Sequence, residues 1–243
     1  MSRQLSRLYE LAQQSDHLFG SPLGPFHEEG NAYYLPQFVH FDARAAEESL
    51  RLAVLAGFGR HDLPAARAVL AFLEDLVRHP DDSQGLNVSV FPVANVAGLL
   101  GGAEERDLAN EHWRRSDRPE IRLLDQNARL RGYQGFVRVV TTADSEPAAW
   151  VRTVSSTSAH ATGVEVFTSE DFHPWPVWFE TVAAAAVRSG PLSIADDLPC
   201  APFEVELALP AGWPQRHADR TLAPLLRRLI TRYRAFLAYG QNL

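Results

Sequence analysis

The sequence lacks several of the residues and segments on which common functions depend. It contains no lysine, because all 23 basic residues are arginine, and this excludes lysine Schiff-base chemistry and a P-loop. Its single cysteine, Cys200, excludes an internal disulfide framework and a cysteine-rich zinc site. Apolar runs such as residues 52–58 fall far short of the roughly 20 residues that span a bilayer. We therefore expect neither disulfides nor membrane spans.

Basic residues are fewer than acidic residues and are scattered along the chain. The net charge is −7, from 30 acidic against 23 basic residues, and no basic block could follow a phosphate backbone. Nucleic acid is therefore not an expected partner. The first residues carry a charge in every turn and no apolar core of a signal peptide, so we expect a cytoplasmic protein.

Hydrophobic periodicity predicts a strand, helix and strand unit in the first half of the chain. Residues 50–57 are apolar apart from Arg51 and end in glycine, which is typical of a buried strand near the centre of a largely parallel sheet. A helix is predicted from about Pro64 to Arg78, with proline in its first turn. The alternating run 86–95 then completes a βαβ crossover.

The rest of the chain predicts more strands between two outer helices. Amphipathic helices are expected over residues 2–14 and 221–239. The further strands lie at residues 33–41, 121–124, 135–142, 163–168 and 203–210. The predicted fold class is one α/β domain over residues 1–243, with a central mixed, mostly parallel twisted sheet and helices on both faces. Residues 1–29 form its N-terminal helix and lead-in.

Four segments stand in the order and with the gaps of landmarks in a known family. They are Leu52-Ala-Val-Leu-Ala-Gly-Phe-Gly-Arg-His-Asp-Leu-Pro, Val90-Phe-Pro-Val-Ala-Asn-Val-Ala-Gly-Leu, Arg106-Asp-Leu-Ala-Asn-Glu-His-Trp and Val205-Glu-Leu-Ala-Leu-Pro. They resemble the AGxHGDEP, PxxNPDG, DLNRNF and LETP segments of the zinc carboxypeptidase clan, which includes the succinylglutamate desuccinylase and aspartoacylase branch. The resemblance runs from about residue 30 to the C-terminus and implies the clan's fold.

The resemblance also implies a site. In that clan a His and a Glu of the first landmark and a later His bind zinc, which acidifies water and polarises the scissile carbonyl. A Glu moves the proton, and arginines hold the carboxylate of the substrate. This chain departs from the pattern at five positions. These are Gly59 for the first His, Asp62 or Leu63 for the Glu ligand, Asp125 or Leu124 for the second His, Ala208 for the catalytic Glu and Glu111 for the Arg.

Other residues could replace some of these groups. A local shift would let His61 and Asp62 face a metal, with Asp125 as the third ligand, although such residues are also common as solvated or capping side chains. Glu206, two residues before Ala208 on the same strand face, is the candidate catalytic base. We expect Glu204 and Glu206 to face solvent, with a cleft as the alternative.

For substrate binding the candidates are Arg106, the nearest retained cation, with Asn110 and Glu111 in the same loop. We therefore hypothesise a zinc-carboxypeptidase-like pseudoenzyme that has lost metal binding and hydrolysis, holds no cofactor and binds a small-molecule or peptide ligand or a partner. The alternative is an active zinc-dependent carboxypeptidase or N-acyl amino acid deacylase with a non-standard ligand set. A third reading is an unrelated α/β domain. The sequence gives no indication of an oligomeric state.

Overall fold

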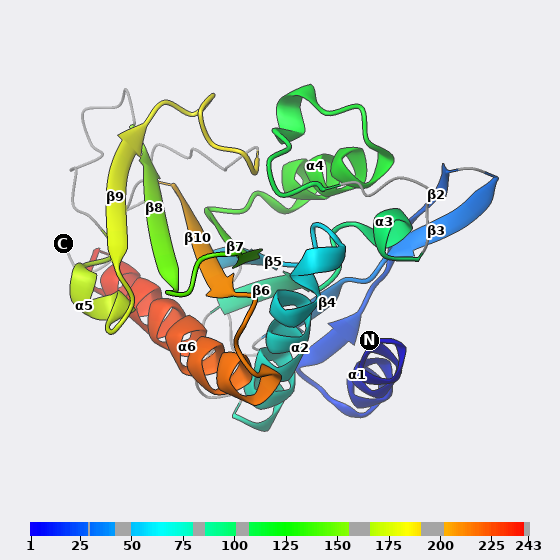
Figure 1. Cartoon of the computed structure of the whole chain (residues 1–243), viewed down its shortest axis with the longest axis horizontal. Coiled ribbons are helices and arrows are strands. Elements are labelled where there is room, and N and C mark those ends of the chain that lie inside the picture. Colours follow the sequence, from blue (N-terminus) through cyan, green and yellow to red (C-terminus); the bar gives the residue numbers. More distant parts are fainter. Residues whose placement is uncertain are drawn as a thin grey trace.

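An eight-stranded mixed sheet runs through the centre of the molecule (Figure 1). The computed structural model describes residues 1–28, 30–41, 50–79, 86–100, 107–155, 166–190 and 202–240. In spatial order the strands are β1 (Leu18–Gly20), β4 (Phe38–Phe41), β6 (Leu86–Phe91), β5 (Leu50–Leu55), β7 (Gly135–Thr142), β10 (Phe203–Pro210), β8 (Ala148–Val154) and β9 (Val177–Val182). Strands β6, β5, β7 and β10 are mutually parallel, as are β8 and β9, while the other pairs are antiparallel. The predicted mixed, mostly parallel sheet is confirmed.

Helices cover both faces of this sheet, as predicted (Figure 1). They are α1 (Ser2–Gln14), α2 (Leu63–Arg78), α3 (Val96–Leu100), α4 (Pro119–Arg131), α5 (Ser169–Phe172) and α6 (Gln215–Gly240), with 3-10 turns η1 (Arg60–Asp62) and η3 (Trp113–Arg115). A hairpin of β2 (Leu23–Glu28) and β3 (Asn31–Leu35) forms a separate small sheet. Of the helices that the structure describes, none is both long and apolar enough to cross a bilayer.

The alternation of side chains along the strands divides the core into two layers. Val54, Val137 and Val205 point to the face that α2 and α6 cover. Leu55 and Phe136 point to the opposite face, where residues of α3, α4 and η3 pack. Because both faces are covered, the central strands read as nearly continuous apolar runs.

The predicted strand at residues 121–124 is wrong, because these residues lie within α4. Pro119 stands in the first turn of the helix, where a missing N–H costs nothing. Ile121, Leu124 and Ala128 lie on one buried face, which is helical spacing rather than alternation. Gly132, in the left-handed region with φ of 61°, ends the helix.

The sequence also missed strands β8 and β9 at the far edge of the sheet. In β8 the half-buried Trp150 and Arg152 alternate with buried Ala149 and Val151, so the signal is present but short. In the predicted strand 163–168, residues 163–165 lie outside the described residues, and residues 166–168 form no strand. The predicted strand 33–41 is divided at Pro36 and Gln37 into the end of β3, in the small sheet, and β4, in the large sheet. The other predicted strands and both outer helices are confirmed, with α6 beginning six residues earlier than predicted.

Candidate functional site

Two loops meet at the carboxyl ends of the parallel strands β5 and β6. Ala94 N–H donates to Ala56 O (2.8 Å), and Asn95 N–H donates to Gly57 O (2.9 Å). Gly57 has φ of 69°, and a Cβ there would lie 2.8 Å from Pro92 O. Only glycine adopts this turn without strain while the loops approach so closely. The turn sends the chain from β5 directly into η1, which carries the candidate residues.

Asp62 is buried at the start of α2 and joins the loop after β5 to the end of β7. Its Oδ2 accepts the N–H of Phe58 (3.2 Å), and its Oδ1 accepts the N–H of Thr141 at the end of β7 (2.6 Å). Burial raises the pKa of Asp62 above its usual value, while the Thr141 N–H and the nearby His61 oppose the rise and Asp107 adds to it. Both carboxylate oxygens therefore hold backbone in place.

His61 and Asp107 complete a small group beside Asp62. His61 Nε2 lies 3.8 Å from Asp62 Oδ1 and 3.8 Å from Asp107 Oδ2, and the three potential ligand atoms lie within 4.8 Å of one another. The imidazole lies against Gly59, where an added Cβ would stand 2.8 Å from His61 Cε1. The structure therefore brings His61 and Asp62 together, with Asp107 as a third member.

A buried cluster of charges lies on the neighbouring strands β7, β8 and β10. Glu206 Oε2 lies 3.1 Å from Arg188, 3.7 Å from Arg138 and 4.0 Å from Arg152. Glu204 contacts Arg152 at 3.1 Å and accepts the N–H of Ser189 at 2.7 Å. We name Arg138, Arg152, Arg188, Glu204 and Glu206 the arginine–glutamate cluster. The prediction that the two glutamates face solvent is wrong, because arginines of adjacent elements cover them.

Arg138 connects this cluster to the loop of the candidate site. Its side chain is fully buried, lies over the ring of Phe58 with 4.8 Å to the ring centroid, and donates to Ala109 O. Burial lowers the pKa of Arg138, and the carboxylates of Glu204 and Glu206 oppose this effect. Since Ala109 follows Asp107 by two residues, the guanidinium holds the Asp107 loop against the sheet.

The comparisons with known proteins agree on one fold. No protein-family model matches the sequence, and no curated protein matches it significantly. A metallo-carboxypeptidase from Burkholderia cenocepacia matches with a TM-score of 0.66 and 14% identity, over 95% of this chain and 68% of that chain. Bovine thrombin-activatable fibrinolysis inhibitor, solved in complex with a tick carboxypeptidase inhibitor, matches with a TM-score of 0.61 and 12% identity, over 100% and 96%. A Shewanella baltica OS155 protein, to which a metallopeptidase function has been ascribed, matches at 0.59 and 14%, over 98% and 89%.

The chain has the zinc carboxypeptidase fold. At such low identity the comparisons show the fold alone, so the chemistry has to be judged from the residues of this chain. Three groups of residues bear on it: the potential metal ligands, the candidate base and the candidate substrate-binding residues.

The potential ligands do not fit the zinc site that the carboxypeptidase resemblance implies. That site has two imidazoles and one carboxylate, whereas His61 meets two carboxylates here. Ligands at 2.0–2.2 Å from a tetrahedral zinc stand about 3.4 Å apart, so the 3.8 Å separations are too wide without movement. Asp62 cannot move freely, because each of its oxygens accepts a backbone N–H in a buried place.

The third ligand considered from the sequence lies elsewhere in the carboxypeptidase fold. Asp125 lies in α4 and pairs with Arg129 at 2.8 Å, an ordinary helix pair of spacing four. Asp125 also lines a polar pocket together with Arg114 and Arg122. The structure therefore does not bring Asp125 together with His61 and Asp62, because the strand expected to carry it is a helix.

The remaining candidates are placed as follows. Ala208 is buried on β10, and Glu206 belongs to the arginine–glutamate cluster. Asn110 and Glu111 lie in the turn that follows Asp107, where Glu111 N–H donates to Leu108 O (3.2 Å). Arg106 lies outside the described residues. Asn110 and Glu111 are thus next to the candidate site in sequence, and Asn110 is exposed.

Sequence reasoning overlooked two residues that matter here. Asp107 stands within the third landmark, where the candidate residues were Arg106, Asn110 and Glu111. Arg138 is a lone charge in the apolar run of residues 135–142, a pattern that indicates a buried and paired charge.

Proposed function

We propose that this chain is a carboxypeptidase-fold protein that has lost zinc-dependent hydrolysis and serves as a binding protein for a small-molecule or peptide ligand. The observation that carries the proposal is the engagement of Asp62. The carboxylate nearest to the ligand position of the clan accepts N–H groups from Phe58 and Thr141, and Gly59 has no side chain to offer. A carboxylate fixed in this way stabilises the fold rather than a metal.

The surroundings of Glu206 support the same proposal. A general base must reach the proton that it removes and release it again. Glu206 instead lies within 4.0 Å of three guanidinium groups, which hold its position. We assign Glu206 a structural role on this ground, and we propose a cytoplasmic location without nucleic-acid partners.

Metal analysis of the purified full chain tests the proposal. We expect no stoichiometric zinc after equilibration with zinc and desalting, an unchanged melting temperature in EDTA, and no hydrolysis of peptides or N-acyl amino acids. One equivalent of zinc that is lost on replacement of His61 and Asp62 by Ala would contradict it. His27→Ala, an exposed histidine on the separate hairpin, is the matched control.

A second candidate function rests on the convergence of His61, Asp62 and Asp107. These three could hold a divalent metal if Asp62 released one backbone N–H, and the protein would then be a metal-dependent hydrolase of peptides or N-acyl amino acids. In that case Asp107→Asn should remove both metal and activity. If the first proposal holds, Asp107→Asn should change neither metal content nor melting temperature appreciably.

A further inference from the structure

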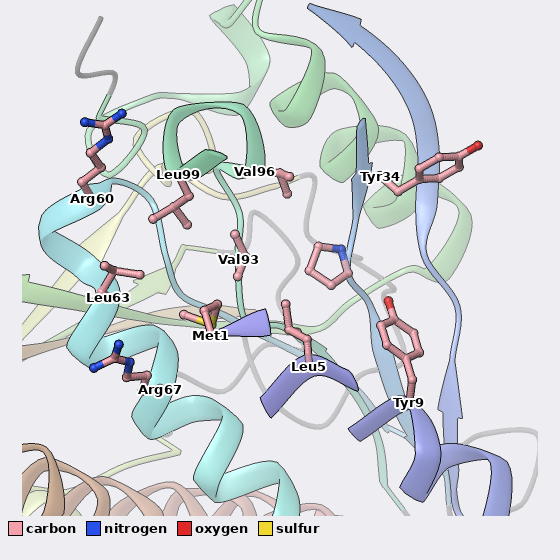
Figure 2. Close-up of a pocket in the computed structure, with 11 residues that line it drawn as sticks. Met1, Leu5, Tyr9, Tyr34, Arg60, Leu63, Arg67, Val93, Val96 and Leu99 are labelled. Atoms are coloured by element: carbon pink, nitrogen blue, oxygen red, sulfur yellow. The ribbon is translucent and has the colours of Figure 1, made fainter. Parts of the chain in front are cut away.

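An apolar pocket lies beside the start of α2, between α1, α3 and the connection from β3 to β4 (Figure 2). Its volume is about 530 Å³, which falls within the range of small-molecule sites. The apolar side chains that line it include Leu5, Leu63, Val93, Val96 and Leu99. Since several separate segments contribute to it, the pocket is a product of the fold and not of one loop.

Two arginines stand at the α2 side of this pocket. Arg60, Leu63 and Arg67 are three and four residues apart, so they share one face at the start of the helix. Figure 2 shows Leu63 between the two arginines. Arg60 Nε donates to Gly98 O (3.2 Å), which holds this side chain near α3. Among the described residues, no carboxylate forms an ion pair with either guanidinium.

The opposite side of the pocket carries neutral groups. Tyr9 and Tyr34 lie there, away from the arginines, with Val93 between the two sides (Figure 2). Burial raises the pKa of Tyr9, so its phenol is uncharged at neutral pH, and its ring packs on Phe38 with 4.8 Å between centroids. The pocket therefore has an apolar interior, with the two exposed arginines at its α2 rim and neutral groups at the opposite side.

We propose that this pocket binds a small monocarboxylate with an apolar body, of the size of a medium-chain fatty acid. Guanidinium groups bind carboxylates through paired, charge-assisted hydrogen bonds, and the apolar body would bury its surface against Leu5, Val93 and Val96. The proposal rests on the ligand-binding half of the proposed function and is independent of whether metal binding is lost. A concave pocket on a chain of net charge −7 favours a free molecule over an anionic membrane surface.

Calorimetric titration of the full chain with octanoate and with 1-octanol tests the proposal. We expect octanoate to bind at least about tenfold more tightly than the neutral alcohol, because only the carboxylate meets the arginines. The double variant Arg60→Ala with Arg67→Ala should lose at least about tenfold in octanoate affinity and little in 1-octanol affinity. The pair Arg114→Ala with Arg122→Ala makes the same charge change at the polar pocket of α4 and should bind octanoate like the wild type.

A second variant tests the position of the carboxylate. Leu63→Glu places a competing negative charge between the two arginines, at a helix start that tolerates acidic residues. It should abolish octanoate binding, whereas Leu63→Gln should retain most of it. Equal octanoate affinity in the wild type and the Arg60/Arg67 variant would overturn the proposal, as would binding to phosphatidylglycerol vesicles without binding of free octanoate.

Zinc content measured on the same sample separates this proposal from the proposed function. Absence of zinc together with absence of octanoate binding overturns only the pocket assignment. Stoichiometric zinc together with octanoate binding sensitive to Arg60 and Arg67 overturns only the loss of metal binding, and supports the pocket.

Discussion

The buried carboxylates in two neighbouring regions of this fold are stabilised by different partners. At the end of β5, Asp62 is satisfied by two backbone N–H groups. Along β10, Glu204 and Glu206 are satisfied mainly by arginine side chains from β7, β8 and the segment before residue 190. The first arrangement fixes the chain path, and the second neutralises charge within the sheet.

This difference indicates which of the two regions could be altered by single substitutions. A carboxylate held by backbone can be freed only by moving loops or strand ends, so its position belongs to the architecture. A carboxylate held by side chains depends on a few residues that substitution can alter one at a time. The arginine–glutamate cluster is thus stable only as a set, and removing one member leaves a buried charge behind.

The largest effect is expected from Glu204→Gln. The side chain is fully buried, and its loss leaves Arg138 and Arg152 with less compensating charge. We expect the free energy of unfolding to fall by about 3–5 kcal/mol, measured by urea denaturation. Glu180→Gln removes an exposed carboxylate outside the cluster that pairs with the same Arg152, and it should cost less than about 1 kcal/mol. Equal effects of the two changes would show that burial does not decide the cost.

Asp62→Ala should have the next largest effect. It leaves the N–H groups of Phe58 and Thr141 without an acceptor in a buried place, at a cost of about 2–3 kcal/mol in the free energy of unfolding. Asp107→Ala removes one bond to the N–H of Ala109 at an exposed position and should cost less than about 1 kcal/mol. If Asp107→Ala cost as much as Asp62→Ala, the contrast between fixed and exposed carboxylates would fail.

The pH dependence of stability gives an independent test of the state of Asp62. Its pKa in the folded state is raised by burial above the usual 3.8, so the folded state binds this proton more tightly than the unfolded state does. Binding of this proton therefore stabilises the folded state. The contribution is fully present below pH 3.8 and is lost as the pH rises through the pKa of the folded state. The free energy of unfolding of the wild type relative to Asp62→Asn should therefore decrease as pH rises through that window. A difference that stays constant with pH would contradict the assignment.

The two regions also differ in how well the sequence predicted them. The apolar patterns of residues 50–57, 64–78 and 86–95 predicted β5, α2 and β6, because apolar period and glycine placement determine such elements locally. The approach of His61 to Asp107 and of Arg138 to Glu204 joins segments far apart in the chain. Periodicity reports which face a residue occupies, but not what lies across from it, so Glu204 and Glu206 were expected to face solvent.

The error at residues 121–124 has a related cause. Three apolar residues in a short run fit either a strand or one face of a helix. Pro119 and Gly132, thirteen residues apart, are the signals that favour a helix. The carboxypeptidase resemblance then placed a candidate metal ligand at Asp125, directly after the supposed strand. A resemblance can thus predict the fold correctly and still misplace an individual residue.

Gly57→Ala should have an intermediate effect, because it disturbs the turn that positions the first region. The residue has φ of 69°, and a Cβ would lie 2.8 Å from Pro92 O. We expect a loss of about 1–2 kcal/mol in the free energy of unfolding. Gly212→Ala, where nothing lies within 4 Å of an added Cβ, should be nearly neutral in the same denaturation experiment. Similar costs at both positions would mean that the loops around Gly57 move to accommodate the added Cβ.

The smallest effect is expected from His61→Ala, and it bears most directly on the contrast between the regions. The imidazole is 43% exposed and stands 3.8 Å from both neighbouring carboxylates, beyond hydrogen-bond range. If His61, Asp62 and Asp107 bind no metal, the free energy of unfolding should change by less than about 0.5 kcal/mol, with or without added zinc. If zinc stabilised the wild type but not His61→Ala, binding of metal to the native state would be the cause. Asp62 would then bind a metal as well as accept backbone N–H groups. A carboxylate that fixes the chain path could in that case also be a functional residue.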